Sequence, residues 1–256
     1  MKKKNENFNG IKNYQNDDLI EKSLNEFYIK NKITHLEATV NFPIYARRTI
    51  LKRFLAHYQL FLKTIDLPGD IIELGVYRGS SLMSWANFLE IHNMGDRQKQ
   101  VFGFDNFKGF TKFDEKDGNF DDNVEKNIGG FDPSKYYEEI NDAIKIFDSD
   151  RFIPHKQRVK LIEGEIENQI PQFIENNPGL RLSLIHFDCD LYLPTKIALE
   201  NLWPLVVKGG VLIFDEYAIR PWEGESKAID EFFNQKNIKF NKFNWSPNPG
   251  AYIIKE

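Results

Sequence analysis

Apolar residues follow two different patterns along the chain. Up to about residue 64 they recur at the spacing of one helix face, and further on they gather in short continuous runs, which are typical of buried strands. The helical spacing is clearest at Ile50, Leu51, Phe54, Leu55, Tyr58, Phe61 and Leu62. Helices are therefore expected ahead of a sheet.

Seven runs of residues predict strands, at 71–76, 101–105, 159–162, 182–187, 211–214, 240–245 and 251–254. Segments able to form helices separate the first five runs, so the sheet should be parallel and doubly wound. A hairpin-like turn at 246–250 joins the last two runs, which predicts an antiparallel last strand. The predicted fold class is α/β and Rossmann-like, with a mostly parallel seven-stranded sheet. An antiparallel edge strand is typical of the methyltransferase version of this fold.

The pattern also divides the chain into an N-terminal helical extension at 1–66 and a catalytic domain at 67–256, which should form one structural unit. Between the second and third strands, residues 110–158 are polar and interrupted by Gly118, Gly129, Gly130 and Pro133. A connection of this length is uncommon in a compact domain and predicts a lid or a substrate loop.

Composition narrows the choice of partners. The 34 basic and 38 acidic side chains give a net charge of -4, which favours neither nucleic acid nor a membrane and leaves a small molecule or a glycan precursor as substrate. The single cysteine, Cys189, excludes an intramolecular disulfide, and no apolar run approaches the roughly 18 residues that span a bilayer. These features predict a cytoplasmic protein.

A glycine-containing loop follows the first strand, from Glu73 to Ser81. Gly75 and Gly79 stand where the backbone has to turn and let a ligand approach, and Ser80 and Ser81 complete the loop. The loop lacks the Gly-x-Gly-x-x-Gly pattern of pyrophosphate binders, which favours a nucleoside without phosphates, such as S-adenosylmethionine. Glu73 is expected to accept from the ligand's ammonium group or to position waters near it. The alternative is a structural turn with a solvated glutamate.

Further cofactor contacts are predicted at the ends of the next two strands. Asp105 ends the second strand, where an acidic side chain can accept both hydroxyls of a ribose, and Asn106 stands beside it. Glu165 follows the third strand and could contact the adenine amino group. The alternatives are that Asp105 is a loop residue or a helix cap, and that Glu165 belongs to a solvated charge cluster with Glu163 and Glu167.

Two pairs of carboxylates follow the fourth and fifth strands: Asp188 with Asp190, and Asp215 with Glu216. Neighbouring strands lie about 4.8 Å apart, so the four side chains would converge if these strands are neighbours. Their mutual repulsion favours a bound cation, and an all-oxygen set suits Mg²⁺ or Mn²⁺. The alternative is that one pair caps helices and the other is solvated. His186, within the fourth strand, is interpreted as a core histidine with a satisfied hydrogen bond.

Four motifs occur in an order that resembles the macrocin O-methyltransferase family, which methylates sugar hydroxyls in macrolide and aminocoumarin biosynthesis. The motifs are Pro68-Gly69-Asp70-x-x-Glu73-Leu74-Gly75-Val76-Tyr77-Arg78-Gly79, Phe104-Asp105-Asn106-Phe107-Lys108-Gly109-Phe110, Asp188-x-Asp190-Leu191-Tyr192-x-x-Thr195 and Gly209-Gly210-x-x-x-x-Asp215-Glu216-Tyr217. The resemblance covers roughly 54–230. It implies an enzyme that uses S-adenosylmethionine and Mg²⁺, in which Asp188, Asp215 and Glu216 hold the metal ion. Asp190 would be the general base, and Asp188 would also contact the cofactor.

The chain departs from the family pattern at Glu216, where aspartate is usual, and at Asn106, where many members have serine or threonine. The first difference leaves the metal preference open. The second, together with the insertion at 110–158, leaves the acceptor open. We expect transfer of a sulfonium methyl group to a sugar hydroxyl. The alternatives are a catechol-type O-methyltransferase and a noncatalytic assembly partner that binds the cofactor or a sugar, and family precedent suggests a homo-oligomer.

Overall fold

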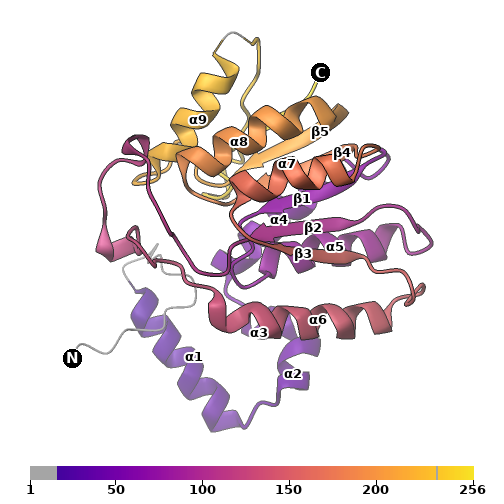
Figure 1. The fold of residues 1–256 in the computed structure, drawn as a ribbon. Helices are drawn as coiled ribbons and strands as arrows, with labels where there is room; N and C mark the ends of the chain where they lie inside the picture. Colours follow the sequence, from indigo (N-terminus) through magenta and orange to yellow (C-terminus); the bar gives the residue numbers. More distant parts are fainter. Residues whose placement is uncertain (1–15, 235) are drawn as a thin grey trace.

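The computed structural model describes residues 16–234 and 236–256, apart from the side chain of Asn123. At its centre is a six-stranded sheet in the order β3-β2-β1-β4-β5-β6 (Figure 1). Neighbouring strands are parallel, except that β6 is antiparallel to β5. The strands are β1 (Asp70–Leu74), β2 (Val101–Asp105), β3 (Val159–Glu163), β4 (Leu182–Phe187), β5 (Val206–Phe214) and β6 (Ala251–Ile254). The predicted α/β class and the antiparallel last strand are confirmed.

The predicted strand at 240–245 is wrong. In the described chain only Asn241 pairs there, through a single antiparallel bridge to Tyr252. The Phe243 carbonyl then accepts a turn hydrogen bond from the Ser246 amide at 3.4 Å, so the chain bends before a second pair can form. The aromatic side chains of this segment pack against neighbouring rings instead, as Phe243 does against Tyr252.

Helices cover both faces of the sheet, which therefore separates two apolar cores (Figure 1). Side chains alternate along each strand, so Ile71 packs in one core and Ile72 in the other. The core of Ile71 is covered by α4 (Arg48–Leu62), α5 (Ser80–His92) and α6 (Tyr137–Asp150). The core of Ile72 is covered by α7 (Ile166–Asn176), α8 (Tyr192–Leu202) and α9 (Glu223–Phe233).

The N-terminal helices differ in how they pack. The first three bury no apolar residue, whereas α4 buries Leu60 and Phe61 in the core of Ile71. These three are α1 (Asp17–Asn31), α2 (His35–Val40) and α3 (Phe42–Tyr45), and Figure 1 shows α1 and α2 standing away from the sheet. Residues 1–15 of the predicted extension lie outside the described residues, and the boundary at residue 66 stays a prediction. No helix in the described ranges is both long and apolar enough to cross a membrane.

The segment predicted as a lid contains regular structure. Before α6 it forms the short 3₁₀ helices η1 (Glu115–Asp117), η2 (Asp122–Val124) and η3 (Ser134–Tyr136). The ammonium of Lys126 anchors its middle part, because it donates to the carbonyls of Asp117 and Pro221 and to Glu223 Oε2. In α6, Ile140 is buried in the core. Since α6 belongs to the core, a lid is restricted to the residues before it.

Candidate active site

A large open cavity lies at the carboxyl ends of the parallel strands, where the strand order reverses between β1 and β4. Its volume is about 1880 Å³. A pocket for one small ligand measures roughly 300–1000 Å³, so this cavity has room for two ligands side by side. The loops after β1, β2, β3, β4 and β5 form its walls together with the helices α1 to α4.

Gly75 lets the backbone at the end of β1 pack directly against the backbone at the end of β4. Its φ is +88°, and a Cβ there would lie 1.9 Å from the carbonyl oxygen of Asp188, so a larger residue does not fit. Gly79 has a φ of +78° and is the last residue before α5. The sequence thus folds into a tight loop whose backbone is open to the cavity, as the glycine spacing predicted.

Asp105 ties this loop to the end of β2. Its Oδ2 accepts from the amides of Val76 and Tyr77 at 2.8 and 2.9 Å, and its Oδ1 accepts from the Phe107 amide at 2.8 Å. Burial raises the pKa of Asp105, although these hydrogen bonds oppose the rise. A carboxylate has about four acceptor positions, so one remains for a ligand hydroxyl. Asp105 therefore fixes the loop and also forms part of the cavity wall.

Glu73 lies behind the cavity. Its side chain is fully buried, and it accepts from Ser81 Oγ at 3.0 Å and from Trp85 Nε1 at 2.7 Å. His186 Nδ1 lies 3.0 Å from the oxygen that Trp85 also contacts. Ser80 and Ser81, in contrast, line the cavity. Any effect of Glu73 on a ligand would therefore pass through neighbours such as Ser81.

Glu165, predicted to contact the adenine, lies together with Asn106, which was predicted as a further cofactor contact. Asn106 Nδ2 donates to the Gly109 carbonyl at 3.0 Å and to Glu165 Oε1 at 3.3 Å. Thr111 Oγ1 donates to the same Glu165 oxygen at 2.9 Å. All of these residues line the cavity. They present hydrogen-bond donors and acceptors at the end of the cavity formed by β2 and β3.

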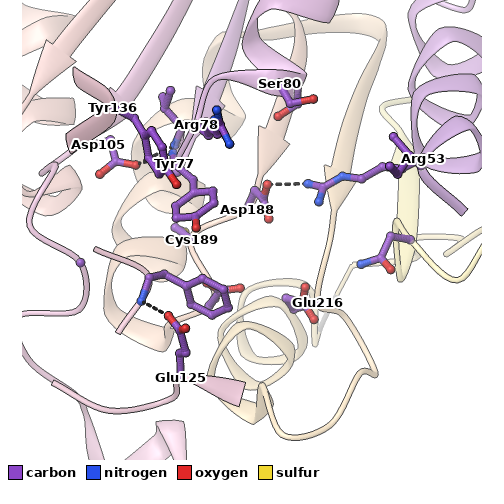
Figure 2. Close-up of a pocket in the computed structure, with 18 of the residues that line it drawn as sticks. Arg53, Tyr77, Arg78, Ser80, Asp105, Glu125, Tyr136, Asp188, Cys189 and Glu216 are labelled. Atoms are coloured by element: carbon purple, nitrogen blue, oxygen red, sulfur yellow. Dashed lines mark hydrogen bonds and ion pairs between the residues drawn. The ribbon is translucent and has the colours of Figure 1, made fainter. Parts of the chain in front are cut away.

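The carboxylates predicted to hold a metal ion converge at the ends of β4 and β5, which are neighbours as the prediction required. Oxygens of Asp188, Asp215 and Glu216 lie within 4.8 Å of one another. Arg53 of α4 reaches into this group, with its Nη2 2.6 Å from Asp188 Oδ2 (Figure 2) and 3.3 Å from Asp215 Oδ2. Asp190 lines the same cavity and has a left-handed backbone, with φ at +63°.

Burial and mutual repulsion disfavour negative charge in this carboxylate group. Burial, followed by repulsion from neighbouring carboxylates, raises the pKa of Asp190 and of Glu216 well above the usual values. Burial also raises the pKa of Asp188, although Arg53 opposes the rise. At Asp215 burial acts to raise the pKa, but the charge of Arg53 and the hydrogen bond and charge of His186 together outweigh it and lower the pKa. One guanidinium thus offsets only part of the negative charge.

The same group fits a divalent cation. Two buried carboxylate oxygens, Glu216 Oε2 and Glu225 Oε2, have no hydrogen-bond partner among the described residues. The other oxygen of Glu225 accepts from the Glu216 amide at 3.0 Å. Buried carboxylates without partners are costly unless they are protonated or face a cation. The oxygen-only set of Asp188, Asp215 and Glu216 is the kind that Mg²⁺ and Mn²⁺ prefer.

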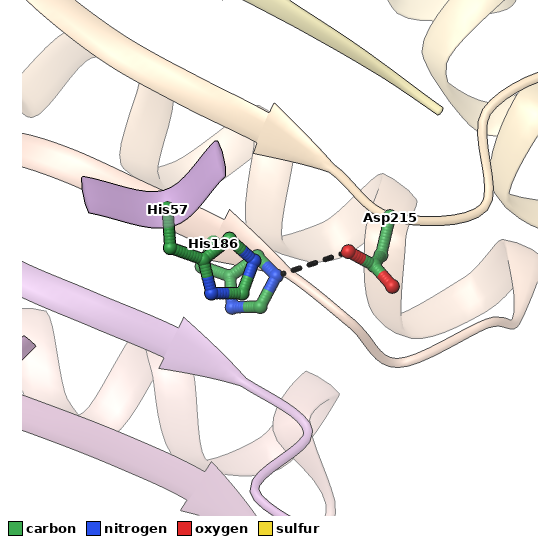
Figure 3. Close-up of side chains that lie close together, drawn as sticks. All are labelled: His57, His186 and Asp215. Carbon is green, nitrogen blue, oxygen red and sulfur yellow. Dashed lines mark hydrogen bonds and ion pairs between the residues drawn. The ribbon is translucent and has the colours of Figure 1, made fainter. Parts of the chain in front are cut away.

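A histidine pair lies against the carboxylates (Figure 3). His186 Nε2 lies 3.5 Å from Asp215 Oδ1, and its other nitrogen faces Glu73. His57 packs edge-on against it, with ring centroids 4.8 Å apart. Burial lowers the pKa of His186, but hydrogen bonds with Asp215 and Glu73 outweigh this effect and raise the pKa to about 10. His186 is a core histidine with hydrogen bonds, as interpreted from the sequence, and it is also a buried positive charge.

We expect the stability of the metal-free protein to fall as the pH rises from 6.5 through about 10. His186 binds its proton more tightly in the folded protein than in the unfolded chain, so its contribution is complete below pH 6.5 and is lost as the pH passes the folded-state value. Thermal unfolding across this range, with a chelator present, tests the expectation. His186→Gln should remove most of the slope, and His35→Gln, at an exposed position, should keep it. An equal slope in both variants would contradict the role of His186.

One comparison decides the family. The family model described as macrocin-O-methyltransferase (TylF) matches residues 11–247, which is most of the chain and includes every site residue above. The chain belongs to the macrocin-O-methyltransferase family. The resemblance that the four motifs indicated is thereby confirmed.

Proteins similar to this chain include antibiotic O-methyltransferases. The 8-demethyl-8-(2,3-dimethoxy-alpha-L-rhamnosyl)-tetracenomycin-C 4'-O-methyltransferase of Streptomyces olivaceus is 28% identical over 70% of this chain and 66% of its own length. The mycinamicin III 3''-O-methyltransferase of Micromonospora griseorubida is 26% identical over 67% of this chain and 63% of its own length. The matches thus span just under two thirds of these two relatives. The solved structure of CalS11, a calicheamicin methyltransferase, has a TM-score of 0.88 and 26% identity, over 95% of this chain and 94% of that chain.

Several site residues of this macrocin-O-methyltransferase family member were missed from the sequence. Arg53 and His57 lie one turn apart on α4, and Asn248 Nδ2 donates to Asp215 Oδ2 at 3.0 Å. The available signal was weak: two basic side chains four residues apart share the helix face that buries Leu60. Helical spacing does not show which strand ends this face of α4 will contact.

Proposed function

We propose that the protein transfers a methyl group from S-adenosylmethionine to a hydroxyl of a sugar or a sugar-containing metabolite, with the help of a divalent cation. One observation carries the proposal. Gly75 passes directly over the backbone of Asp188, so the glycine loop and the carboxylate group open into one cavity, which has room for a cofactor and an acceptor together. The family and the rhamnosyl group in the name of the tetracenomycin relative support a sugar as acceptor.

In this proposal the cofactor lies along the ends of β1, β2 and β3. S-adenosylmethionine supplies, when bound, an electrophilic methyl group on a positively charged sulfur. Glu73 supports the site from behind, through Ser81 and His186. The residues proposed to contact the cofactor are Gly75, Gly79, Ser80, Ser81, Asp105, Asn106, Glu165 and Asp188.

Asp188, Asp215 and Glu216 are proposed to hold Mg²⁺ or Mn²⁺. Such a cation supplies, when bound, positive charge that lowers the pKa of a nearby hydroxyl. This matters because the pKa of an alcohol is far above the roughly 4 of an aspartic acid, so a carboxylate alone deprotonates it poorly. Vicinal hydroxyls of a sugar suit the site, since two oxygens can be held and oriented together.

Asp190 is proposed as the general base. Burial and the neighbouring carboxylates raise its pKa well above the usual value, which favours the protonated form in the absence of a cation. A divalent cation held by Asp188, Asp215 and Glu216 would weaken that repulsion and favour the ionised form of Asp190. Proton removal by Asp190 would then depend on cation binding.

The test is a methyl-transfer assay with labelled S-adenosylmethionine and Mg²⁺, in which nucleotide-linked deoxysugars and glycosylated polyketides are compared with catechols. Transfer to sugar hydroxyls is the expected result. Transfer to catechols alone would assign the protein to the catechol-type enzymes instead. Tight cofactor binding without metal binding, and without turnover on any polyhydroxylated acceptor, would leave a noncatalytic assembly partner.

We expect cofactor and acceptor together to order residues 110–132. Phe110 and Phe131 line the cavity, and their ring centroids lie 5.7 and 5.9 Å from that of Trp222, so an aromatic cluster covers one side of the site. Hydrogen exchange measured with S-adenosylhomocysteine and a sugar acceptor should slow at these amides. Helix α6, which packs Ile140 and Ile144 in the core, is the internal reference, since its exchange should not change. Equal protection with and without ligands would argue against a lid.

A further inference from the structure

Arg53 is the cationic side chain at the centre of the carboxylate group. It projects from α4 and uses one nitrogen, Nη2, for both of its contacts there, at 2.6 Å from Asp188 Oδ2 (Figure 2) and 3.3 Å from Asp215 Oδ2. Burial alone would lower the pKa of Arg53, but the two aspartates raise it above the usual value, so the guanidinium is charged. Arg53 thus adds positive charge at both aspartates, whereas His186 contacts only Asp215.

The contacts of Arg53 compete with those of a metal ion. Asp188 and Asp215 are two of the three residues proposed to hold the divalent cation, and Arg53 occupies an oxygen of each. Mg²⁺ binds oxygens at about 2.0–2.1 Å, so a cation on the same two oxygens would lie within about 4 Å of Nη2, where like charges repel strongly. The guanidinium and the cation therefore cannot share these oxygens in their present positions.

Arg53 also has room to move. Its side chain is 37% exposed and lines the open cavity, whereas Asp215 is only 1% exposed and is held from another side by Asn248. Withdrawal of the guanidinium into the cavity would leave the aspartates in place. The strands fix the carboxylates, and the long, flexible arginine side chain is the part that can yield.

We propose that Arg53 is a built-in counter-cation that occupies the carboxylate group in the metal-free protein and has to withdraw when a divalent cation binds. The inference rests on the cation site of the proposed function and adds to it the residue that sets its affinity. Cation binding becomes an exchange of one positive group for another. Because α4 carries Arg53, the exchange also changes what holds this helix to the strand ends.

The first test is the affinity for Mn²⁺ as the probe, measured by electron paramagnetic resonance on the full chain after removal of metal. Arg53→Gln removes the competing charge, so it should bind Mn²⁺ about tenfold more tightly or better, with Arg53→Lys in between. Lys52→Gln is the matched control, because Lys52 lines the same cavity on the same helix and has no ion pair with these aspartates in the described structure. Its affinity should stay within about twofold of wild type, since a distant charge is screened.

The second test uses the wild-type protein and follows withdrawal itself. Modification of arginine by phenylglyoxal, mapped by mass spectrometry, should become faster at Arg53 when Mn²⁺ is added and stay constant at Arg220, which is exposed. Equal or weaker Mn²⁺ binding by Arg53→Gln, protection of Arg53 by Mn²⁺, or no Mn²⁺ binding to any of the proteins would overturn the inference. Methyl transfer to a sugar by the wild-type protein is scored separately, so a failure of this inference is distinguishable from a failure of the proposed reaction.

Discussion

Asp188→Asn is expected to lower turnover by about 1000-fold or more while the affinity for S-adenosylmethionine stays within about threefold of wild type. Asp188 Oδ2 is the oxygen that receives the charge of Arg53, so it faces the position where a cation is needed. An amide of the same shape carries no charge to hold that cation. The glycine loop should be unaffected, because Gly75 packs against the backbone carbonyl of Asp188, which asparagine retains.

The measurement separates a catalytic role from a structural one. Turnover is followed with a sugar acceptor at saturating Mg²⁺, and cofactor affinity is measured by calorimetry on the same samples. Asp132→Asn is the matched control, because it removes a carboxylate from the wall of the same cavity outside the carboxylate group. A parallel loss of turnover and cofactor affinity in Asp188→Asn would assign Asp188 to cofactor binding or to the structure of the site, and retained turnover would remove it from the mechanism.

The parallel sheet could be predicted from the sequence because each of its inner strands is buried on both faces. β4 shows this most clearly, since all six of its residues are buried, Ser183 and His186 included. The edge next to β6 could not be predicted in the same way. The segment 240–245 carries three aromatic side chains among three polar ones, but its rings pack on neighbouring segments and a turn at Phe243 ends the pairing. Local composition does not show whether aromatic side chains pack from a paired strand or from a segment outside the sheet.

The site was predictable where strand order alone decides it. Asp188 and Asp215 meet because β4 and β5 are parallel neighbours and end at one edge. The direction of Glu73 was not predictable from the loop motif. It lies within β1 and shares a face with Ile71, so it points into the core beside Trp85. A strand residue and a loop residue of the same motif can thus face opposite ways.

The place of Arg53 in the site could not be predicted from the sequence for a different reason. It contacts Asp188 from 135 residues away, and the contact depends on how α4 docks against the sheet. Helical periodicity shows which side chains share a face, but it does not show where along the sheet that face will rest. The cofactor loop and the carboxylates belong to strand ends, whereas the counter-cation comes from a helix before the sheet. That part of the site needed a structure.

Asp190→Asn is expected to lower kcat by about 100-fold to 10000-fold, the usual contribution of a general base, while the affinity for Mn²⁺ stays within about threefold. Asparagine suits the substitution because it tolerates the left-handed backbone of this position, where φ is +63°. The loss should therefore reflect chemistry and not folding. A base has to be ionised, so kcat of the wild type should fall as the pH drops through the pKa of Asp190, which burial raises.

The pH profile distinguishes a base from a residue that only shapes the cavity. If Asp190 removes the proton, the low residual rate of Asp190→Asn should lose the acidic limb and rise only with hydroxide. Asp114→Asn serves as the reference, since it changes a carboxylate of the cavity wall that comes from the segment before α6, and it should keep the wild-type profile. Turnover of Asp190→Asn close to wild type would exclude Asp190 as the base. Loss of Mn²⁺ affinity along with turnover would instead place Asp190 among the residues that hold the cation.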